Sequence, residues 1–296
     1  MSNPFKLKAL LIDLNGTLHL GSEPTKGAVQ AIERLRNARI PFIFCSNSTK
    51  ESSAQLMGKL QKMGFKAEKD ELITSLGACK QLIEEKGYKR PFLMMSDSAK
   101  EEFSTSPSNS TSSEVPHDSV ILGLHPPSLS YDNLNLAFRI LKSEPISCSS
   151  SSSSSSPSSG SGDGKKAALI APHKAMYQQS PSTSDLPAGL SLGIGPFVTA
   201  LEESTGEKAY IVGKPTKRFF ELAIERLQYK CQIELRKEDV GVIGDDVIND
   251  LGQGAIDLGL KRILVRTGKY RSGSEKTDNP PDRVYENFAE FIDDLL

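Results

Sequence analysis

The sequence predicts an α/β protein in which a Rossmann-like parallel sheet core carries an inserted, smaller α/β domain. Three observations favour this fold. Short apolar runs that end in polar turns alternate with amphipathic helices, which is typical of a parallel sheet. This alternation breaks off in the middle of the chain and returns near residue 209. The 296 residues leave room for roughly two domains of about 150 residues each.

The first strand is predicted where the apolar run Leu7 to Ile12 stops at Asp13-Leu-Asn-Gly-Thr. Such a run, bounded by a polar turn, reads as a buried strand. After Pro24, apolar residues recur at helical spacing, which predicts an amphipathic helix. Its apolar positions are Ala28, Ile32 and Leu35.

The same order of strand, turn and helix follows once more in the first half. Pro41 to Cys45 is a second apolar run, and Ser46-Asn-Ser-Thr follows it. Ser48 and Glu51 have the spacing of a capping box, which predicts that the next helix begins there. The apolar face of that helix consists of Leu56, Leu60 and Met63, with Gly64 as a stop.

Three further strands are predicted near the C-terminal end. The first is Ala209 to Val212, which is followed by Gly213-Lys-Pro and a helix. The second is Val240 to Ile243, which is followed by Gly244-Asp-Asp and a helix through Ala255 and Leu258. The last is Ile263 to Val265. Ligands of open parallel sheets bind outside the carboxyl ends of the strands. We therefore expect all four polar turns at one edge of the sheet.

The middle of the chain has a different character. Two serine-rich segments, Ser104 to Ser113 and Ser147 to Ser161, cannot bury enough apolar surface to order themselves and are expected to be disordered loops. Phosphorylation of these serines is the functional alternative. Strand-like pieces and a helical stretch surround the two segments, at Phe92 to Met95, Val120 to Leu124, Ala168 to Ile170 and after Tyr131. We predict a core domain of residues 1–88 and 196–296, with an inserted domain of residues 89–195.

Composition narrows the partners and the compartment. A net charge of −1 offers no overall basic field, so neither nucleic acid nor an anionic membrane is expected as a partner. No segment approaches the roughly 18 apolar residues of a membrane span. The four cysteines are widely spaced, which does not indicate a disulfide framework, and a cytoplasmic setting is expected. They are Cys45, Cys79, Cys148 and Cys231.

The turns after the first two strands supply candidate ligands for a phosphoryl group. A carboxylate such as Asp13, near a glycine that lets the backbone approach a ligand, can act as nucleophile and Mg²⁺ ligand together. Asp13 and Asn15 also fit an ordinary Asx turn. Ser46 and Asn47 can donate hydrogen bonds to phosphoryl oxygens, while Ser48 can simply cap the next helix.

The remaining turns add a cation and carboxylates. Lys214 is suited to neutralise a carboxylate and a phosphoryl oxygen, although a lysine before proline is usually solvated surface. Asp245, Asp246 and Asp250 follow the strand at 240–243, and Mg²⁺ typically uses one or two carboxylates. Asp250 can alternatively cap its helix. Nucleophile, donors, cation and metal carboxylates at one sheet edge together indicate a catalytic site.

These motifs, in this order, resemble those of the haloacid dehalogenase-like hydrolase superfamily. They are Asp13-x-Asn-Gly-Thr, Ser46-Asn, Gly213-Lys214-Pro, and Gly244-Asp245 followed after four residues by Asp250. The insertion between the second and third motifs is similar to the capped, NagD-type branch of phosphatases. The resemblance implies a Mg²⁺-dependent phosphatase that acts through an aspartyl-phosphate on a small phosphorylated substrate or a phosphoamino acid.

The resemblance also implies residue roles at the metal. Asp13 would be the nucleophile and the first Mg²⁺ ligand. The backbone carbonyl of Asn15 and the carboxylate of Asp245 would complete the protein's share of the metal shell. Asp250 would support the metal site, and Asp246 falls at a variable position without an assigned role.

Further roles concern the phosphoryl group and the inserted domain. By resemblance, Ser46 and Asn47 would hold the phosphoryl group, and Lys214 would bridge it to Asp13. The inserted domain would close as a cap, exclude water and select the leaving group. His173, with Lys174 and Tyr177, can face the substrate from the cap, but a surface histidine is expected. A homodimer through the cap is a family-level expectation.

The sequence departs from the family pattern at Asn15. Most phosphatases of this superfamily carry an aspartate there, which protonates the leaving group. A carboxamide cannot deliver a proton near neutral pH, which forfeits a typical factor of about 100 to 10,000 in rate. Either the leaving group needs no acid, as in a phosphoramidate, pyrophosphate, acyl or aryl phosphate, or the chain is a phosphate-binding or regulatory module with little turnover. Phosphoryl transfer to another acceptor ranks last.

Overall fold

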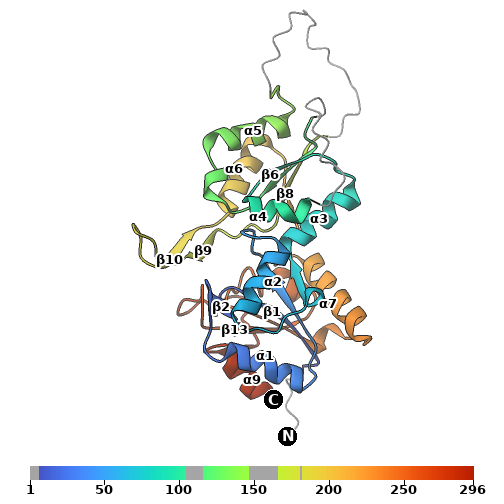
Figure 1. Ribbon diagram of the computed structural model, residues 1–296, viewed down its shortest axis with the longest axis vertical. Helices are drawn as coiled ribbons and strands as arrows, with labels where there is room; N and C mark the ends of the chain where they lie inside the picture. Colours follow the sequence, from blue (N-terminus) through green and yellow to red (C-terminus); the bar gives the residue numbers. More distant parts are fainter. Residues whose placement is uncertain (1–6, 105–115, 147–165, 181) are drawn as a thin grey trace, which may run out of the picture.

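Six parallel strands form the central sheet of the computed structural model (Figure 1). The structure describes residues 7–104, 116–146, 166–180 and 182–296. The strand order is β14-β13-β12-β1-β4-β5, and every adjacent pair is parallel. The strands are β1 (Ala9–Asp13), β4 (Phe42–Ser46), β5 (Leu72–Thr74), β12 (Val240–Gly244), β13 (Lys261–Val265) and β14 (Arg283–Tyr285).

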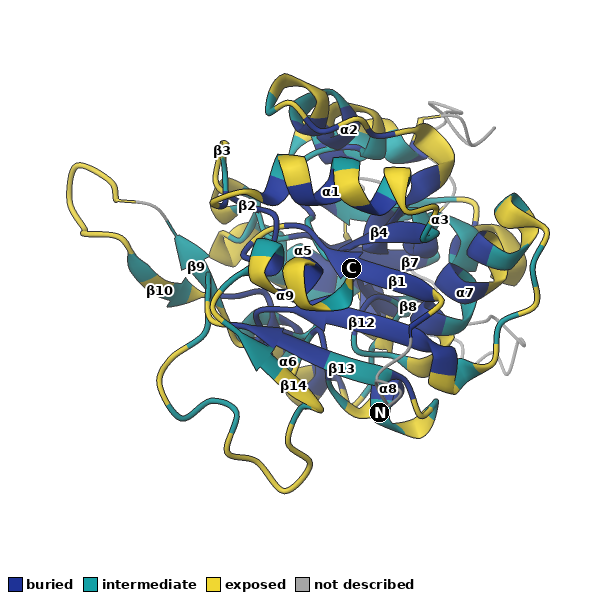
Figure 2. Ribbon diagram, turned by 90° about the horizontal axis from the view of Figure 1, so that it is seen from below, coloured by how far each residue is buried: buried dark blue, intermediate teal, exposed yellow. Residues whose placement is uncertain are grey.

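The three strands in the middle of the sheet, β1, β4 and β12, are buried along their whole length (Figure 2). Strands covered on both faces read as continuous apolar runs, which is why the sequence reveals them. Helices α1 (Ala28–Asn37), α2 (Ser53–Lys62) and α9 (Phe288–Leu295) share a core with one face of the sheet. The opposite face packs against α7 (Lys217–Cys231) and α8 (Gln253–Asp257). The predicted α/β class is confirmed.

A second parallel sheet of four strands forms the inserted domain, in the order β11-β8-β7-β6. Two apolar clusters cover it, one with α5 and α6 and the other with α3 and α4. The strands are β6 (Pro91–Met94), β7 (Ser119–Leu122), β8 (Ala168–Ala171) and β11 (Tyr210–Ile211). The helices are α3 (Ser75–Lys86), α4 (Asp97–Lys100), α5 (Tyr131–Lys142) and α6 (Gly195–Thr205).

The packing extends the inserted domain beyond the predicted residues 89–195 at both ends. Helix α3 falls within residues 1–88, the range predicted for the core domain, but its Leu76 and Cys79 share an apolar cluster with Ile170 of the inserted sheet. Helix α6 and strand β11 also belong to this domain, because Val198 lies in its core and β11 pairs with β8. The strand predicted at 209–212 is therefore not part of the central sheet. Local sequence indicates a strand, but which sheet it joins depends on distant partners.

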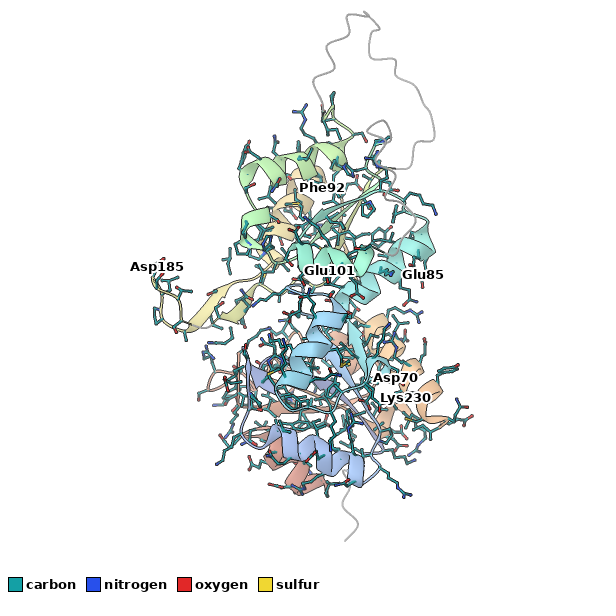
Figure 3. All side chains as sticks on the ribbon, in the orientation of Figure 1. Asp70, Glu85, Phe92, Glu101, Asp185 and Lys230 are labelled. Atoms are coloured by element: carbon teal, nitrogen blue, oxygen red, sulfur yellow. The ribbon has the colours of Figure 1, made fainter. Side chains whose placement is uncertain are left out.

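The predicted start of helix α2 at Ser48 is wrong. The helix begins at Ser53, and Ser52 is its N-cap, whose side chain accepts a hydrogen bond from the backbone N–H of Gln55. Carboxylates from the inserted domain complete this helix end, because Ser53 N–H donates to Glu102 at 2.8 Å. Figure 3 shows Glu101, which accepts from Ser52, where the two domains meet.

Smaller elements complete the described chain. A hairpin of β9 (Tyr177–Ser180) and β10 (Gly189–Leu192) projects from the inserted domain (Figure 1), and a short pair of strands, β2 (His19–Leu20) and β3 (Glu23–Pro24), follows β1. The 3-10 helices are η1 (Lys69–Glu71), η2 (Glu101–Phe103), η3 (Pro126–Ser128) and η4 (Lys237–Asp239). An ion pair links α7 to the 3-10 helix η1, where Lys230 Nζ lies 2.9 Å from Asp70 (Figure 3).

Several sequence expectations concern the serine-rich segments, the cysteines and membrane-spanning helices. Apart from Ser104, both serine-rich loops lie outside the described residues. Cys45, Cys79 and Cys231 are free thiols, and Cys148 lies outside the described part of the chain. Across the residues with assigned positions, none of the helices is long and apolar enough to cross a membrane.

Candidate active site

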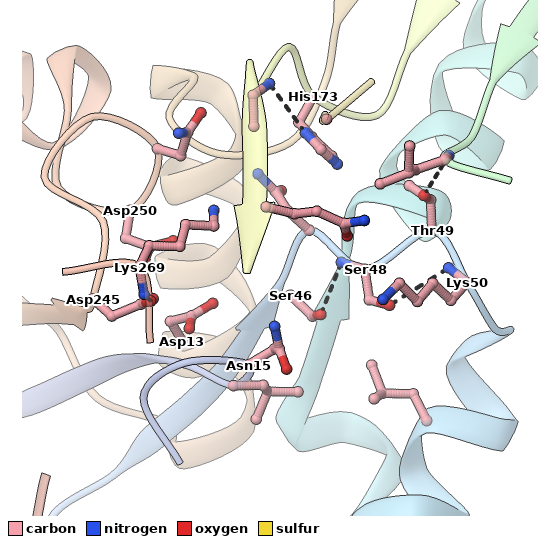
Figure 4. A pocket seen from close by; sticks show the side chains of 18 of the residues that line it. Asp13, Asn15, Ser46, Ser48, Thr49, Lys50, His173, Asp245, Asp250 and Lys269 are labelled. Carbon is pink, nitrogen blue, oxygen red and sulfur yellow. Dashed lines mark hydrogen bonds between the residues drawn. The ribbon is translucent and has the colours of Figure 1, made fainter. Parts of the chain in front are cut away.

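The polar turns after β1, β4 and β12 meet at the carboxyl edge of the central sheet (Figure 4). Lys214 reaches this edge from the loop after β11, so the fourth turn comes from a strand of the inserted sheet. A cleft lined by residues of both domains opens onto the site. Its lining includes Asp13, Asn15, Ser46, Asn47, His173, Asp245, Asp250 and Lys269.

Lys214 is buried between two carboxylates. Its Nζ lies 2.5 Å from Asp13 Oδ1 and 2.8 Å from Asp250 Oδ1, and its side chain is only 1% exposed. Burial alone would lower the pKa of Lys214, but Asp13 and Asp250 raise it above its ordinary value. The lysine therefore stays protonated and balances part of the negative charge of the site. Asp250 does not cap helix α8, since Gly252 is the N-cap.

Three buried carboxylates, those of Asp13, Asp245 and Asp250, each place an oxygen within 4.8 Å of the others. Burial, and then repulsion by Asp250, raises the pKa of Asp13 to about 6. Burial and both neighbouring carboxylates likewise raise the pKa of Asp245 well above its ordinary range. Because like charges in a buried site destabilise one another, this cluster has a deficit of positive charge.

The donor set fits a hard divalent cation. Oxygen ligands from carboxylates are what Mg²⁺ prefers, and Asp13 Oδ2 is buried without a hydrogen-bond partner among the described residues. An unpaired buried carboxylate oxygen is costly unless a bound ion or a water molecule satisfies it. The residues at this edge can therefore hold a metal ion.

The turn after β1 needs glycine at residue 16. Gly16 has a φ of 106°, a conformation that other residues rarely adopt. A Cβ at this position would lie 2.2 Å from Asp245 Oδ2. The glycine thus lets the turn carrying Asn15 pack directly on the carboxylate of Asp245. The backbone of this turn closes on itself, because Gly16 N–H donates to the carbonyl of His19 at 2.8 Å.

The side chain of Asn15 is exposed and lies at the cleft beside Asp13 (Figure 4). Its carboxamide can donate and accept hydrogen bonds there but cannot release a proton near neutral pH. Asn15, the residue that differs from the aspartate of most superfamily phosphatases, therefore lies at the cleft beside Asp13.

Ser46 and Asn47 take different positions at the end of β4. Ser46 is buried at the cleft, and its Oγ accepts a hydrogen bond from Ser48 N–H at 3.1 Å (Figure 4). Its own hydroxyl hydrogen remains available to donate. The Asn47 carboxamide instead bonds to the backbone of Lys214, whose N–H donates to Oδ1 and whose carbonyl accepts from Nδ2.

Sequence reasoning missed Lys269. Its backbone N–H donates to Asp245 Oδ2 at 2.6 Å, and its Nζ lies 2.9 Å from Asp246 Oδ2. The Asp246 carboxylate therefore pairs with a lysine and is not one of the three carboxylates of the cluster. Burial opposes the Lys269 charge, but Asp246, Asp250 and Asp245 raise its pKa. The signal was the polar turn after the strand at 263–265, because it is a further strand end at the same edge of the sheet.

His19, also missed, lines the cleft and is 2% exposed. Its Nδ1 lies 3.0 Å from the carbonyl oxygen of Gly21, so Nδ1 carries the hydrogen, since a carbonyl only accepts. Its Nε2 is buried without a hydrogen-bond partner within the described part of the chain. Burial, and then the charge of Lys59, lowers the pKa of His19 to about 4.

The expectation that His173 is a surface histidine is wrong. The side chain is buried at the roof of the cleft (Figure 4), where Nδ1 accepts from Ala175 N–H at 3.2 Å. Burial, and then Lys269 and Lys214, lowers the pKa of His173 to about 3. Tyr177 lines the same cleft and is 40% exposed, whereas Lys174 pairs with Glu202.

Two family models match the chain. A haloacid dehalogenase-like hydrolase model covers residues 10–106, and a HAD-hydrolase-like model covers residues 211–291. Haloacid dehalogenase-like hydrolase domain-containing protein 2 of Mus musculus is 39% identical over 291 residues, 98% of this chain and 96% of the relative. Phospholysine phosphohistidine inorganic pyrophosphate phosphatase of Homo sapiens is 31% identical over 295 residues, 98% and 94% of the two chains.

Solved structures share the two-domain architecture. A 4-nitrophenylphosphatase from Thermotoga maritima superimposes with a TM-score of 0.75 at 25% identity, over 98% of each chain. NagD from E. coli K-12 has a TM-score of 0.72 at 18% identity, over 96% of this chain and 98% of its own, which shows the fold alone. The predicted capped, NagD-type resemblance is confirmed. The chain belongs to the haloacid dehalogenase-like hydrolase family and groups with the phosphatases within it.

Proposed function

We propose that this chain is a Mg²⁺-dependent phosphatase that forms an aspartyl-phosphate on Asp13. The observation that carries the proposal is the buried contact between Asp13 and Lys214 beside two further carboxylates. With a pKa of about 6, Asp13 is mainly ionised at pH 7. A carboxylate in that state, at the end of a strand and facing a cleft, can act as a nucleophile.

The metal-binding residues are proposed to be Asp13, Asp245 and the backbone carbonyl of Asn15, with Asp250 in support. This set is supported by the unpartnered Asp13 Oδ2 and by three carboxylates that outnumber the one lysine between them. When bound, Mg²⁺ supplies charge stabilisation to the phosphoryl oxygens. Lys214 adds a fixed positive charge to the same group.

The proposed reaction has two steps, in which Asp13 is first phosphorylated and then regenerated. An Asp13 oxygen attacks phosphorus while the bond from phosphorus to the leaving group breaks, and the electron pair departs with that group. Water then attacks the acyl phosphate, releases inorganic phosphate and restores the carboxylate. The Ser46 hydroxyl, whose hydrogen is free to donate, binds a phosphoryl oxygen. The cap excludes bulk water from the cleft.

Asn15 determines the proposed substrate class. Because it cannot protonate the leaving group, turnover favours substrates whose leaving group departs without that proton. These are phosphoramidates with a protonated nitrogen, pyrophosphate, acyl phosphates and aryl phosphates. Two relatives named above support this class, one named for phospholysine, phosphohistidine and pyrophosphate, and the other for 4-nitrophenyl phosphate.

Asn15 also supports a second candidate function. A chain without the proton donor but with the phosphate-binding groups intact can serve as a phosphate-binding or regulatory module with little turnover. The buried carboxylate cluster argues for the enzyme, because it destabilises the metal-free protein and a binding module has no need of a nucleophile.

The test is phosphate release from a panel of alkyl phosphates, aryl phosphates, pyrophosphate and phosphoramidates, with Mg²⁺ or with a chelator. We expect Mg²⁺-dependent release from the last three classes and weak release from alkyl phosphates. Asp13→Asn, which is nearly isosteric, serves as the inactive control. Absence of release from every substrate, together with binding of inorganic phosphate, would favour the binding module.

A further inference from the structure

Lys214 sits where the chain returns from the inserted domain to the core domain. Strand β11 pairs with β8, and this pairing continues through Gly213, whose N–H donates to the carbonyl of Pro172 at 2.7 Å. One residue later, Lys214 Nζ contacts Asp13 and Asp250 in the core domain. The catalytic lysine is thus carried on a linker rather than on a strand end of the central sheet.

Asn47 fixes this linker from the core side. Lys214 N–H donates to Asn47 Oδ1 at 3.0 Å, and Asn47 Nδ2 donates to the Lys214 carbonyl at 2.9 Å. The carboxamide pairs with both backbone groups of one residue, as a neighbouring peptide would. The fit is close, because a Cβ on Gly213 would lie 2.4 Å from Asn47 Oδ1. Asn47 is the residue after β4, so the pairing is anchored in the buried centre of the sheet.

We propose that Asn47 is a positioning residue that holds Lys214 against Asp13, and that its effect on the reaction is transmitted through Lys214 rather than through the phosphoryl group. This assignment rests on the proposed function. It replaces the role expected from sequence, in which Asn47 holds the phosphoryl group directly. The amide oxygen accepts from the Lys214 N–H, and one amide N–H donates to the Lys214 carbonyl. A single N–H is left that could donate to a phosphoryl oxygen.

The pairing demands asparagine. Alanine would leave the N–H and carbonyl of the buried residue Lys214 unpaired, which is unfavourable. Aspartate would keep an oxygen that accepts from the Lys214 N–H. Its second carboxylate oxygen would lie against the Lys214 carbonyl oxygen, and two acceptors without a hydrogen between them repel each other. A misplacement of catalytic groups by about 1 Å can cost on the order of 100-fold in rate. We therefore expect Asn47→Ala to lower kcat/KM by about 10- to 100-fold.

A double-mutant cycle with Lys214 tests the proposal. We measure kcat/KM for 4-nitrophenyl phosphate, and Mg²⁺-dependent binding of inorganic phosphate by calorimetry, in the wild type, Asn47→Ala, Lys214→Ala and the double variant. If Asn47 acts through Lys214, Asn47→Ala lowers kcat/KM and the affinity for inorganic phosphate when it is made in the wild-type background. The same substitution has no further effect on either value when it is made in Lys214→Ala. Equal losses in both backgrounds would show direct phosphoryl binding and overturn the proposal.

Controls separate this result from misfolding and from failure of the proposed function. Asn133→Ala removes an amide that donates to the carbonyl of Ser128 in the inserted domain and is expected to leave both measurements unchanged. Asn47→Asp is the second variant, and it should also lose its effect in the Lys214→Ala background. If the wild type binds phosphate but shows no turnover, the proposed phosphatase function is refuted. The double-mutant cycle measured by phosphate binding still tests the positioning role of Asn47 in that case. A fully folded Asn47→Ala variant with unchanged phosphate binding would refute the positioning role.

Discussion

Lys214 Nζ and Asp13 Oδ1 lie 2.5 Å apart, with side chains that are 1% and 9% exposed. The pair is not isolated, because Lys214 also contacts Asp250, and Asp245 lies in the same cluster. Lys214 is therefore a buried positive charge that stabilises the adjacent carboxylates. Its removal has consequences for stability as well as for catalysis.

We predict that Lys214→Met destabilises the metal-free protein more at pH 8 than at pH 5. Breaking a buried ion pair typically costs about 3–5 kcal/mol, because a buried charge is left unpaired. Burial raises the pKa of Asp13 to about 6, so at pH 5 this carboxyl is largely protonated and the loss of Lys214 matters less. Urea unfolding at the two pH values measures the difference. Lys66→Met, which removes an exposed pair with Glu33, is the control and should cost about 0–1 kcal/mol at both pH values.

A second prediction concerns Asp245→Asn. The variant loses a proposed ligand, so Mg²⁺ affinity and turnover should fall sharply. The metal-free variant should nevertheless be at least as stable as the wild type, because one of three mutually repelling carboxylates has become neutral. Calorimetric titration with Mg²⁺ and thermal unfolding with and without the ion measure both effects. The control is Asp257→Asn, at the exposed end of α8, which should change neither the Mg²⁺ affinity nor the thermal stability. Unchanged Mg²⁺ affinity in Asp245→Asn would refute the assignment of Asp245 as a ligand.

Asn15→Asp tests the role of the missing proton donor. Expulsion of an alkoxide needs a proton, whereas a phenolate, whose parent phenol has a pKa of about 10, leaves far more readily. The restored carboxylate should therefore raise hydrolysis of alkyl phosphates more than that of aryl phosphates or phosphoramidates. Single-turnover kinetics isolate the phosphorylation step from hydrolysis of the acyl phosphate. No selective gain on alkyl esters, at unchanged Mg²⁺ affinity, would mean that the proton donor lies elsewhere.

The buried histidines predict how stability depends on acid. In the folded protein the pKa of His19 is about 4, lowered by burial and then by Lys59, against about 6.5 in the unfolded chain. As the pH falls, His19 therefore takes up a proton in the unfolded chain before it does so in the folded protein. The stability that the neutral, buried His19 contributes is fully present above pH 6.5 and is lost as the pH falls toward 4. At pH 5 the loss is about 2 kcal/mol per such histidine.

His19→Gln should accordingly show a smaller loss of stability between pH 7.5 and pH 5 than the wild type does. Urea unfolding at the two pH values gives the comparison, and His125→Gln, in a half-buried position of the inserted domain, is the matched control. An identical loss in His19→Gln and the wild type would show that His19 is protonated in the folded state.

The sequence allowed the central sheet to be predicted because its middle strands are continuous apolar runs. Val240 to Ile243 is buried on both faces, so no polar residue interrupts its pattern. Strand β11 was recognised but assigned to the wrong sheet, because its pairing with β8 depends on residues about 40 positions away. The start of α2 was misplaced for a similar reason, since Glu102 from the inserted domain completes the helix end at Ser53.

The candidate site was predictable where one local motif supplies one role. Asp13, Lys214 and Asp250 do lie together. Sequence could not reveal that Asn47 pairs with the Lys214 backbone, because the two are 167 positions apart. Nor could it reveal that Lys269 reaches Asp245 and Asp246, since a lysine in a polar turn usually remains in solvent.

The most direct measurement of the proposed chemistry is identification of the phosphorylated residue. The protein is mixed with 4-nitrophenyl phosphate and Mg²⁺, quenched in acid within one turnover, digested and analysed by mass spectrometry. We predict one phosphoryl group on the peptide containing Asp13, released by hydroxylamine as expected for an acyl phosphate, and absent without Mg²⁺ or in Asp13→Asn. Steady phosphate release with no label on that peptide, or with the label on another residue, would contradict it.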